Sequence, residues 1–441
     1  MRIAMIGGGY VGLVSGACFA EFGTDVTIVE RDEKKLAALR EGRIPIFEPG
    51  LDTIVASNTQ AGRLTFGNDL TSAIADADAV FIAVGTPTRR GDGHADLTYV
   101  YAATREIALA AKKDLLIVTK STVPVGTGRE VARILKETRP ELSFDVASNP
   151  EFLREGNAIG DFMRPDRVII GINHDTDDKG ARATELMRRL YRPLSLIEAP
   201  IVLTDLETAE LTKYAANAFL AMKVTFINEM ADLCEKVGGN IHDVARGMGL
   251  DQRIGKRFLN PGPGYGGSCF PKDTRALSAI AKDAGAPAQL VDTTVRINER
   301  RKVDMAERII ARSGGSVRGK TIAVLGLTFK PDTDDMREAA SLPIIQTLHE
   351  QGATLRVFDP EGMTAAKPLL PAELHYCTDA LDAAQGADAL VVLTEWNMFR
   401  ALDPERLKDT MQGRVIVDLR NIWSARIMRD AGFDYSSVGR P

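Results

Sequence analysis

Residues 2–12 read R-I-A-M-I-G-G-G-Y-V-G, and this stretch decides the fold of the first part of the chain. Its apolar start meets three glycines with the spacing G-x-G-x-x-G, namely Gly7, Gly9 and Gly12. A helical pattern follows, and then a second apolar run at residues 25–29. A strand, a glycine turn, a helix and a strand within about thirty residues are typical of a dinucleotide-binding βαβ unit.

An acidic residue, Glu30, ends the second apolar run. The start of the intervening helix would offer N–H groups and a positive dipole end to a pyrophosphate. Glu30 would accept hydrogen bonds from the adenosine ribose hydroxyls and repel a 2′-phosphate, which favours NAD over NADP as the cofactor. Arg31, the next residue, is the feature that argues against this preference.

The α/β alternation continues, with apolar strands expected at residues 79–84 and 115–119. Thr86 and Thr122 follow these strands. Open α/β sheets bind ligands beyond the carboxyl ends of their strands, so either threonine could reach a nicotinamide ribose or ring. Each could equally be a turn former.

A long helical pattern runs from about residue 203 to Gly238 without glycine or proline, and a further helical stretch is expected to end near residue 313. Apolar runs then return, and they predict four more strands at 321–325, 354–358, 389–393 and 415–419. The fold class is therefore α/β, with two Rossmann-like, doubly wound domains joined by a long central helix. The expected domains are 1–200 (dinucleotide binding), 201–313 (central helical region, with a possible dimer face) and 314–441 (second Rossmann-like domain).

The first strand–helix loop of the second α/β region reads G-L-T-F-K-P-D-T-D-D-M-R and lacks G-x-G-x-x-G. This region is expected to bind something other than a dinucleotide. Lys330 and Arg337 make its loop a candidate anion site.

Residues 264–273 read G-Y-G-G-S-C-F-P-K-D and place Cys269 in a glycine-rich turn. Glycines let a ligand approach the backbone closely. Lys272 would favour the reactive thiolate, and Asp273 could accept a proton or hold a water. We interpret Cys269 as a nucleophile in a ligand-binding loop; the alternative is a buried cysteine in an ordinary turn.

Two further pairs of residues are catalytic candidates. Lys213 and Asn217 lie four apart on the long helix and hence on one face, where they could stabilise an oxyanion. A solvated Lys–Asn pair is the alternative. Glu151 and Glu155 in N-P-E-F-L-R-E-G have helical i, i+4 spacing, and two like charges on one face favour a site role for at least one of them.

Composition limits the class of protein. The chain has 441 residues and a net charge of −5, which gives no reason to expect a nucleic-acid or membrane partner. Its four cysteines include no C-x-x-C pair and its five histidines show no metal-ligand spacing, so neither a disulfide framework nor a metal site is expected. Scattered cysteines and the lack of a membrane-length apolar run predict a cytoplasmic location.

A dinucleotide site combined with a nucleophilic cysteine indicates oxidation through a thiohemiacetal to a thioester, which water then cleaves. The chain also resembles the UDP-glucose/GDP-mannose dehydrogenase family, which oxidises nucleotide-diphosphate sugars to uronic acids. The motifs that carry this resemblance span the chain and are G-G-G-Y-V-G, P-I-F-E-P-G-L, G-T-P-T, S-T-V-P-V-G-T, N-P-E-F-L-R-E-G, K-Y-A-A-N-A-F, G-Y-G-G-S-C-F-P-K-D and G-L-T-F-K-P-D-T-D-D-M-R.

The resemblance implies two successive oxidations of UDP-glucose at C6 by two NAD+, giving UDP-glucuronate via a thioester on Cys269. It implies a UDP-sugar-binding role for residues 314–441 and a homodimer formed through the central helix, with Arg253 serving the neighbouring subunit. The family commonly has Asp where this chain has Glu30, whose longer side chain can still reach a ribose diol.

The resemblance also assigns residues to roles. The catalytic residues it implies are Cys269, Lys213, Asn217 and Asp273, with Thr122 and Glu151 assisting the water. The cofactor-binding residues are Gly7, Gly9, Val11, Gly12, Glu30, Lys35, Thr86, Thr122, Glu155, Lys272 and Arg337. The substrate-binding residues are Glu151, Phe152, Leu153, Arg154, Glu155, Lys213, Asn217, Arg253, Phe258, Leu259, Asn260, Pro261, Gly262, Gly266, Lys330 and Arg420.

Three alternatives remain at this point. The same chemistry could act on another nucleotide sugar, such as GDP-mannose or UDP-N-acetylmannosamine. A single-step hydroxyacid dehydrogenase would also use a lysine four residues before an asparagine, but it would not need Cys269. A non-catalytic nucleotide-sugar sensor is the third possibility.

Overall fold

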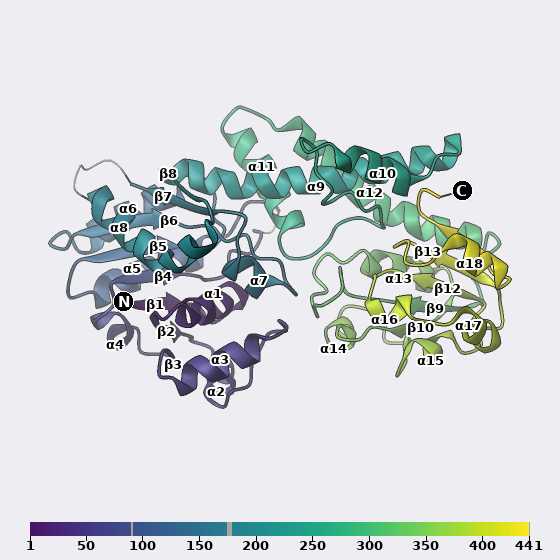
Figure 1. The fold of residues 1–441 in the computed structure, drawn as a ribbon, viewed down its shortest axis with the longest axis horizontal. Coiled ribbons are helices and arrows are strands. Elements are labelled where there is room, and N and C mark those ends of the chain that lie inside the picture. Colours follow the sequence, from purple (N-terminus) through teal and green to yellow (C-terminus); the bar gives the residue numbers. More distant parts are fainter. Residues whose placement is uncertain (90, 174–178, 441) are drawn as a thin grey trace. The chain divides into compact units, whose positions relative to one another are not determined.

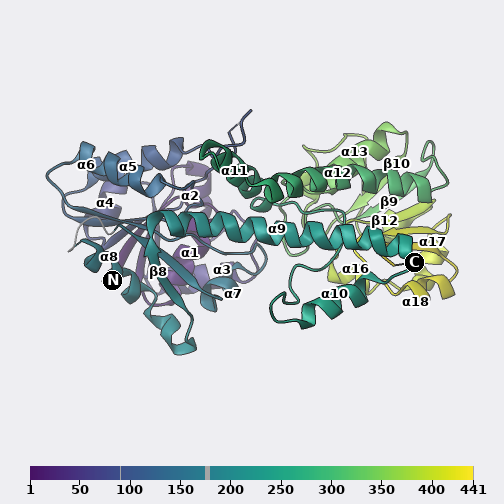
Figure 2. The same cartoon turned by 90° about the horizontal axis from the view of Figure 1, so that it is seen from above.

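The structure, a computed structural model, describes residues 1–89, 91–173 and 179–440. The chain divides into two compact units (Figure 1). Unit 1 comprises residues 1–216 and 279–285, and unit 2 comprises residues 217–278 and 286–441. The helix α9 (Leu206–Val237) is one continuous element of 32 residues (Figure 2) that contributes to both units, as does α11 (Phe270–Asp283).

Unit 1 contains an eight-stranded sheet with the order β3-β2-β1-β4-β5-β6-β7-β8. The first six of these strands are parallel and have the order of a dinucleotide-binding fold, whereas β7 pairs with β6 antiparallel. The strands are β1 (Arg2–Ile6), β2 (Asp25–Val29), β3 (Leu64–Gly67), β4 (Ala79–Ile82), β5 (Leu115–Thr119), β6 (Phe144–Ser148), β7 (Val168–Ile172) and β8 (Ile201–Asp205).

Helices cover both faces of this sheet, which explains why its central strands β4 and β5 are almost entirely apolar and buried along their whole length. Along β1, Ile3 and Met5 face one core and Ala4 and Ile6 face the other, as the two-residue period of a strand requires. The helices of unit 1 are α1 (Tyr10–Glu21), α2 (Glu33–Arg40), α3 (Leu51–Gln60), α4 (Leu70–Ala75), α5 (Thr98–Ala110), α6 (Thr127–Thr138), α7 (Ala158–Met163), α8 (Lys179–Leu190) and a 3₁₀ helix (Arg192–Ile197). Of these, α1, α3, α7 and α8 pack on the first core, and α4, α5 and α6 on the second.

Unit 2 contains a six-stranded parallel sheet with the order β11-β10-β9-β12-β13-β14, the same order in sequence as the first six strands of unit 1. The strands are β9 (Thr321–Leu325), β10 (Thr354–Phe358), β11 (His375–Tyr376), β12 (Ala389–Val392), β13 (Val415–Asp418) and β14 (Asp434–Ser437). Its remaining helices are α10 (Ile241–Leu250), α12 (Gln289–Arg312), α13 (Ser341–Glu350), α14 (Met363–Ala366), α15 (Ala380–Ala384), α16 (Asn397–Arg400), α17 (Pro404–Thr410) and α18 (Ala425–Asp430).

The predicted fold class is confirmed: each sheet is doubly wound, and a long helix follows the first one in sequence. The helical stretch expected to reach residue 313 is wrong in one respect, because it is two helices, α11 and α12, with Gly285 at a φ of +69° between them. The long helix begins at Leu206, and the strand β8 occupies the residues just before it. Among the helices of the described residues, none has both the length and the apolar character needed to span a membrane.

Candidate active site

The turn between β1 and α1 forms a cradle for a dinucleotide. Gly7 has a φ of +108°, and a Cβ at Gly12 would lie 1.9 Å from the carbonyl oxygen of Gly7, so both positions require glycine. A Cβ at Gly9 would meet no atom of the chain within 4 Å. Space therefore remains beside Gly9 at the N-terminus of α1, where a pyrophosphate is expected to bind.

Glu30 lies at the end of β2 with its carboxylate fixed toward this turn. Its Oε2 accepts a hydrogen bond from the Gly8 N–H at 3.0 Å, and its Oε1 accepts from the N–H groups of Arg31 and Asp32 at 2.7 and 2.9 Å. The side chain of Arg31 forms an ion pair with Glu106 on α5. The Arg31 cation that argued against NAD is thus paired with a carboxylate, and the Glu30 carboxylate is placed to accept hydrogen bonds from the ribose hydroxyls of NAD.

We expect Gly12→Ala and Gly9→Ala to separate folding from cofactor binding. Gly12→Ala should lower the free energy of unfolding by about 1–3 kcal/mol, because its Cβ overlaps the Gly7 carbonyl. Gly9→Ala should change it by less than about 1 kcal/mol but weaken NAD binding at least about tenfold. Denaturant unfolding and calorimetric titration with NAD measure the two effects. Unchanged NAD affinity in Gly9→Ala would show that the dinucleotide does not occupy this turn.

Thr86 and Thr122, predicted at the carboxyl ends of neighbouring strands, lie together in unit 1. The Thr86 hydroxyl donates to the main-chain oxygen of Thr122 at 2.9 Å. Thr122 is buried and follows β5 by three residues. Among the other predicted cofactor residues, Val11 is partly buried on α1 and Lys35 is exposed on α2.

Glu151 and Lys213 form a buried ion pair in unit 1. Lys213 Nζ on α9 lies 3.0 Å from Glu151 Oε1, and the two side chains are 3% and 6% exposed. The other carboxylate oxygen of Glu151 accepts from the Leu153 N–H at 2.6 Å. Burial opposes the ionisation of Glu151, but Lys213 and the Leu153 N–H outweigh burial, and the pKa of Glu151 is lowered. Glu151 is therefore a carboxylate at neutral pH.

The interpretation of Glu151 and Glu155 as one helical face is wrong. Residues 149–155 form no helix, and α7 begins only at Ala158. Within this loop the predicted substrate residues have separate partners: Arg154 pairs with Asp161 at 2.5 Å, and the Phe152 ring lies 5.2 Å from Lys213 Nζ.

In unit 2, Cys269 immediately precedes α11. It is partly exposed, whereas the other three cysteines are buried (Cys18, Cys234 and Cys377), and none of the four forms a disulfide. The Asp273 N–H donates to the Cys269 carbonyl at 2.8 Å, so the thiol lies at the N-terminal end of the helix, a position that favours a thiolate. The alternative interpretation of Cys269, as a buried cysteine in an ordinary turn, is wrong because the residue is partly exposed.

Asp273 bonds two other predicted site residues of unit 2, Asn217 and Lys272. The carboxylate is 1% exposed, and it accepts from Asn217 Nδ2 on one oxygen and from Lys272 Nζ on the other, both at 2.6 Å. Lys272, which was expected to act on the thiol, is therefore bonded to the neighbouring carboxylate. The Asn217 amide, held by this bond, is exposed to solvent over only 6% of its surface.

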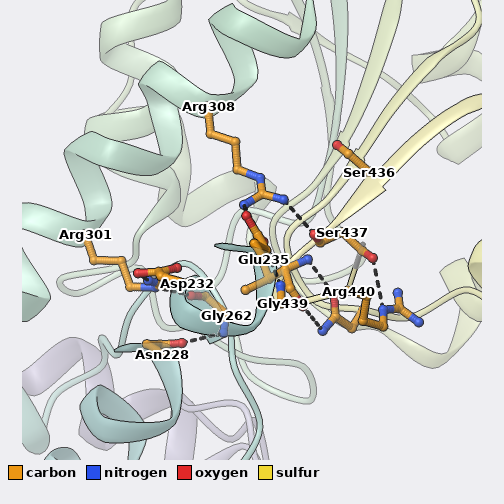
Figure 3. A network of polar contacts seen from close by, with 12 residues as sticks. Asn228, Asp232, Glu235, Gly262, Arg301, Arg308, Ser436, Ser437, Gly439 and Arg440 are labelled. Atoms are coloured by element: carbon orange, nitrogen blue, oxygen red, sulfur yellow. Dashed lines mark hydrogen bonds and ion pairs between the residues drawn. The ribbon is translucent and has the colours of Figure 1, made fainter. Parts of the chain in front are cut away.

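The loop before Cys269 is fixed through Gly262 (Figure 3). Its N–H donates to Asn228 Oδ1 at 2.8 Å, and its carbonyl accepts from Arg301 Nε at 2.7 Å. A Cβ at Gly262 would lie 3.1 Å from Arg420 Nη1, so two predicted substrate residues are neighbours. Arg420 itself donates to the Leu393 carbonyl at 2.8 Å.

The remaining predicted substrate residues of unit 2 differ in their exposure. Phe258 has a φ of +64°, and its ring packs 5.9 Å from that of Phe270. Leu259 is 3% exposed and lies in the core. Pro261 is buried and Asn260 is exposed. Arg253 is bonded to Asp251, with 89% of its side chain exposed.

Two more predicted positions lie where the Cys269 loop contacts the second Rossmann-like region. A Cβ at Gly266 would lie 2.4 Å from the Glu338 carbonyl, and the Gly267 N–H donates to the Arg337 carbonyl at 2.8 Å. The Arg337 side chain bonds Asp335. Lys330 Nζ lies 5.4 Å from the Phe329 ring in the same region. The loop without G-x-G-x-x-G is thus adjacent to the cysteine loop in unit 2.

Asp359 follows the second strand of its sheet, as Glu30 does in unit 1, but the chain itself occupies its carboxylate. It is 1% exposed. Its Oδ2 accepts from the N–H groups of Leu327 and Thr328, the Thr328 hydroxyl and Trp396 Nε1, at 2.7–3.2 Å. Its Oδ1 accepts from the N–H groups of Glu361 and Gly362. A ribose diol would find no free acceptor here.

Sequence reasoning missed three buried polar residues. Glu48, in the motif P-I-F-E-P-G-L, accepts from the N–H groups of Gly156 and Ala158 at 2.7 Å and from the Tyr10 hydroxyl. Glu210 accepts from the N–H groups at the start of α6, and burial raises its pKa to about 7. Lys120 is buried beside the predicted Thr122. Glu48 belongs to a distinctive motif and Lys120 directly precedes one, but only their tertiary partners identify them.

Comparison with known proteins places these features in one family. Three models of the UDP-glucose/GDP-mannose dehydrogenase family match the chain: the NAD binding domain at residues 1–195, the central domain at 207–300 and the UDP binding domain at 323–425. UDP-glucose 6-dehydrogenase of Rhizobium meliloti (strain 1021) is 59% identical over 441 residues, covering 100% of both chains.

Two solved structures are similar over the whole chain. A UDP-glucose dehydrogenase from Pyrobaculum islandicum has a TM-score of 0.90 and 36% identity, covering 100% of this chain and 98% of the other. A UDP-D-ManNAc dehydrogenase from Pyrococcus horikoshii has a TM-score of 0.86 and 28% identity, covering 100% and 99%. The chain therefore belongs to the UDP-glucose/GDP-mannose dehydrogenase family.

Proposed function

We propose that this protein is an NAD-dependent dehydrogenase that oxidises UDP-glucose twice at C6 to give UDP-glucuronate, with Cys269 as the covalent nucleophile. The observation that carries the proposal is the placement of Cys269: it is the partly exposed cysteine, and it starts a helix whose first turn holds the buried Asp273. The identity of 59% with a UDP-glucose 6-dehydrogenase supports UDP-glucose as the sugar.

In this mechanism the residues of the chain bind, orient and move protons. Bound NAD+ supplies the hydride acceptor for both oxidations. The Cys269 sulfur adds to the C6 aldehyde to give a thiohemiacetal, and the second oxidation converts this to a thioester. Water then attacks the thioester carbonyl, which releases the carboxylate and returns the thiol.

The polar residues have distinct roles in this scheme. Lys213 and Asn217 stabilise the oxyanion that develops on the sugar. Glu151 and Asp273 are the carboxylates that can take the proton of the attacking water, and the Thr122 hydroxyl orients it. The proposed cofactor and substrate contacts are those that the motifs assign.

The test is a count of NADH formed per sugar with UDP-glucose, GDP-mannose and UDP-N-acetylmannosamine as substrates. We expect two NADH per UDP-glucose consumed, with little turnover of the other two sugars. One NADH per sugar and release of the aldehyde would contradict the four-electron mechanism. Preference for another sugar would keep the chemistry and change the substrate. Tight UDP-sugar binding without NADH formation would indicate a sensor.

A homodimer is part of the proposal. On α9 the apolar side chains of Phe219, Phe226, Leu233 and Val237 are 57%, 42%, 51% and 70% exposed. Their spacing of seven, seven and four residues places them in one stripe, as in a helix that packs against another helix. Light scattering should give twice the chain mass of 47.8 kDa. A monomer at micromolar concentration would contradict this part of the proposal. The cytoplasmic location stays a prediction.

A further inference from the structure

Lys120 is a buried cation at the carboxyl end of β5 in unit 1. It is 4% exposed. Its Nζ donates to Asn149 Oδ1 at 3.0 Å and to the Tyr191 hydroxyl at 3.1 Å, and it lies 5.8 Å from the centroids of the Phe162 and Tyr191 rings. Among the residues that the structure describes, no carboxylate lies within ion-pair distance of this ammonium.

Local structure does not require this ammonium. The Tyr191 hydroxyl already donates to Asn149 Oδ1 at 2.6 Å, and Asn149 Nδ2 donates to the Ile169 carbonyl at 2.8 Å. Both side chains would keep a hydrogen-bond partner without Lys120. Burying a cation without an ionic partner is unfavourable, and burial lowers the pKa of Lys120 to about 7. A buried, perturbed lysine in such surroundings indicates a functional role.

The position of Lys120 connects two predicted catalytic loops. Lys120 lies two residues before Thr122, and Asn149 lies two residues before Glu151. The two loops leave neighbouring parallel strands, β5 and β6, whose last residues, Thr119 and Ser148, are paired in register. The Lys120–Asn149 hydrogen bond therefore joins the two loops at their starts.

Lys120 also acts on the buried ion pair through its charge. Apart from burial, the charges that affect its pKa are Glu151, which raises it, and Lys213, which lowers it. In turn Lys120 favours the ionised form of Glu151. The remaining titratable group beside it is the Tyr191 hydroxyl, whose pKa burial raises and which therefore stays neutral.

We propose that Lys120 is a positioning residue for the reaction: it holds the loops of Thr122 and Glu151 together through its hydrogen bond to Asn149, and its charge adds to that of Lys213 beside the Glu151 carboxylate. This inference rests on the proposed function. It assigns Lys120 no contact with the substrate or the cofactor.

The test is Lys120→Met, which keeps the length of the side chain and removes the charge. We expect its Tm to rise by about 2 °C or more, because a buried cation without an ionic partner is replaced by an apolar group. We expect kcat to fall, by up to about 100-fold, with KM changed little, because the catalytic loops lose their alignment.

The pH profile distinguishes positioning from a merely structural role. Without the Lys120 charge, Glu151 is easier to protonate, so the acid limb of the kcat profile should move to higher pH, by about half a unit or more. The Tm difference should be largest below pH 7. It should narrow above pH 7, where the unfolded wild-type chain still holds a proton on Lys120 that the folded chain has released.

Lys302→Met is the matched control for the sign of the stability change. Lys302 is also buried, at 3% exposed, but it has carboxylate partners in Glu299 and Glu338 at 3.3 and 3.7 Å. Its removal should lower the Tm. A lower Tm or a failure to fold in Lys120→Met would show that Lys120 is structural and overturn the inference, as would an unchanged pH profile. Failure of the proposed function would appear separately, as wild-type protein that forms no NADH from UDP-glucose.

Discussion

Cys269→Ala is expected to stop uronate formation, with a fall in kcat on the order of 10⁴-fold or more. Without the sulfur no thioester can form, so the second oxidation has no covalent intermediate to release as an acid. The measurement is product analysis by mass spectrometry with NADH detection. The matched control is Cys377→Ala, which removes a buried cysteine far from the loop in sequence and should leave kcat near the wild-type value.

Cys269→Ser tests the same covalent step by replacing the thiol with a hydroxyl instead of removing the nucleophile. Serine is a weaker nucleophile than cysteine, and its alkoxide is a poorer leaving group than a thiolate, so acyl transfer should be slow and an ester adduct should persist. Intact-protein mass spectrometry would detect the added sugar. Uronate formation by Cys269→Ala at wild-type rates, or no adduct in any Cys269 or Glu151 variant, would contradict covalent catalysis.

Glu151→Gln should have the second-largest effect, a fall in kcat of about 100-fold to 10,000-fold. The amide cannot accept a proton from water, so the thioester on Cys269 should accumulate and be visible by mass spectrometry. The substitution also leaves Lys213 buried without its carboxylate, which should lower the free energy of unfolding by about 3–5 kcal/mol.

The double variant Glu151→Gln with Lys213→Met separates the two consequences. It should recover much of the stability, because it also removes the Lys213 charge that Glu151→Gln leaves without its carboxylate, but it should recover none of the activity. In the wild type, the stabilisation from the pair should be present at neutral pH and be lost as acid protonates Glu151, whose pKa is lowered in the folded state. Wild-type turnover by Glu151→Gln would mean that another group activates the water.

Local sequence predicted those parts of the site that depend on local geometry. The glycine turn was predictable because Gly7 needs a positive φ and Gly12 has no room for a Cβ. The position of Cys269 between a turn and a helix was predictable because glycines precede it and Asp273 follows within one helical turn. Thr86 and Thr122 were predicted to lie close together because they follow neighbouring parallel strands, whose carboxyl ends lie at one edge of the sheet.

Long-range contacts were not predictable in this way. Glu151 and Lys213 are 62 residues apart in sequence, and residues 151–155 lie in a loop instead of the expected helix. In the sequence, Lys120 is indistinguishable from an ordinary polar residue after a strand. Its burial depends on contacts with residues such as Tyr191, which is 71 residues away. Edge strands such as β11, with only two residues, are too short to give a periodic signal.

Six strands of each sheet have the same order, and an acid follows the second strand of each. Of these two acids, Glu30 can still accept a hydrogen bond from a ligand, whereas Asp359 cannot. Three N–H groups of the chain bind Glu30, whereas six donors surround Asp359 and saturate the roughly four lone pairs of a carboxylate. Any redesign of the second sheet to hold an adenosine would first have to free that acid from its own backbone. Strand order alone thus does not show which of the two sheets can bind a dinucleotide. The number of hydrogen-bond acceptors that the chain leaves unoccupied does show it.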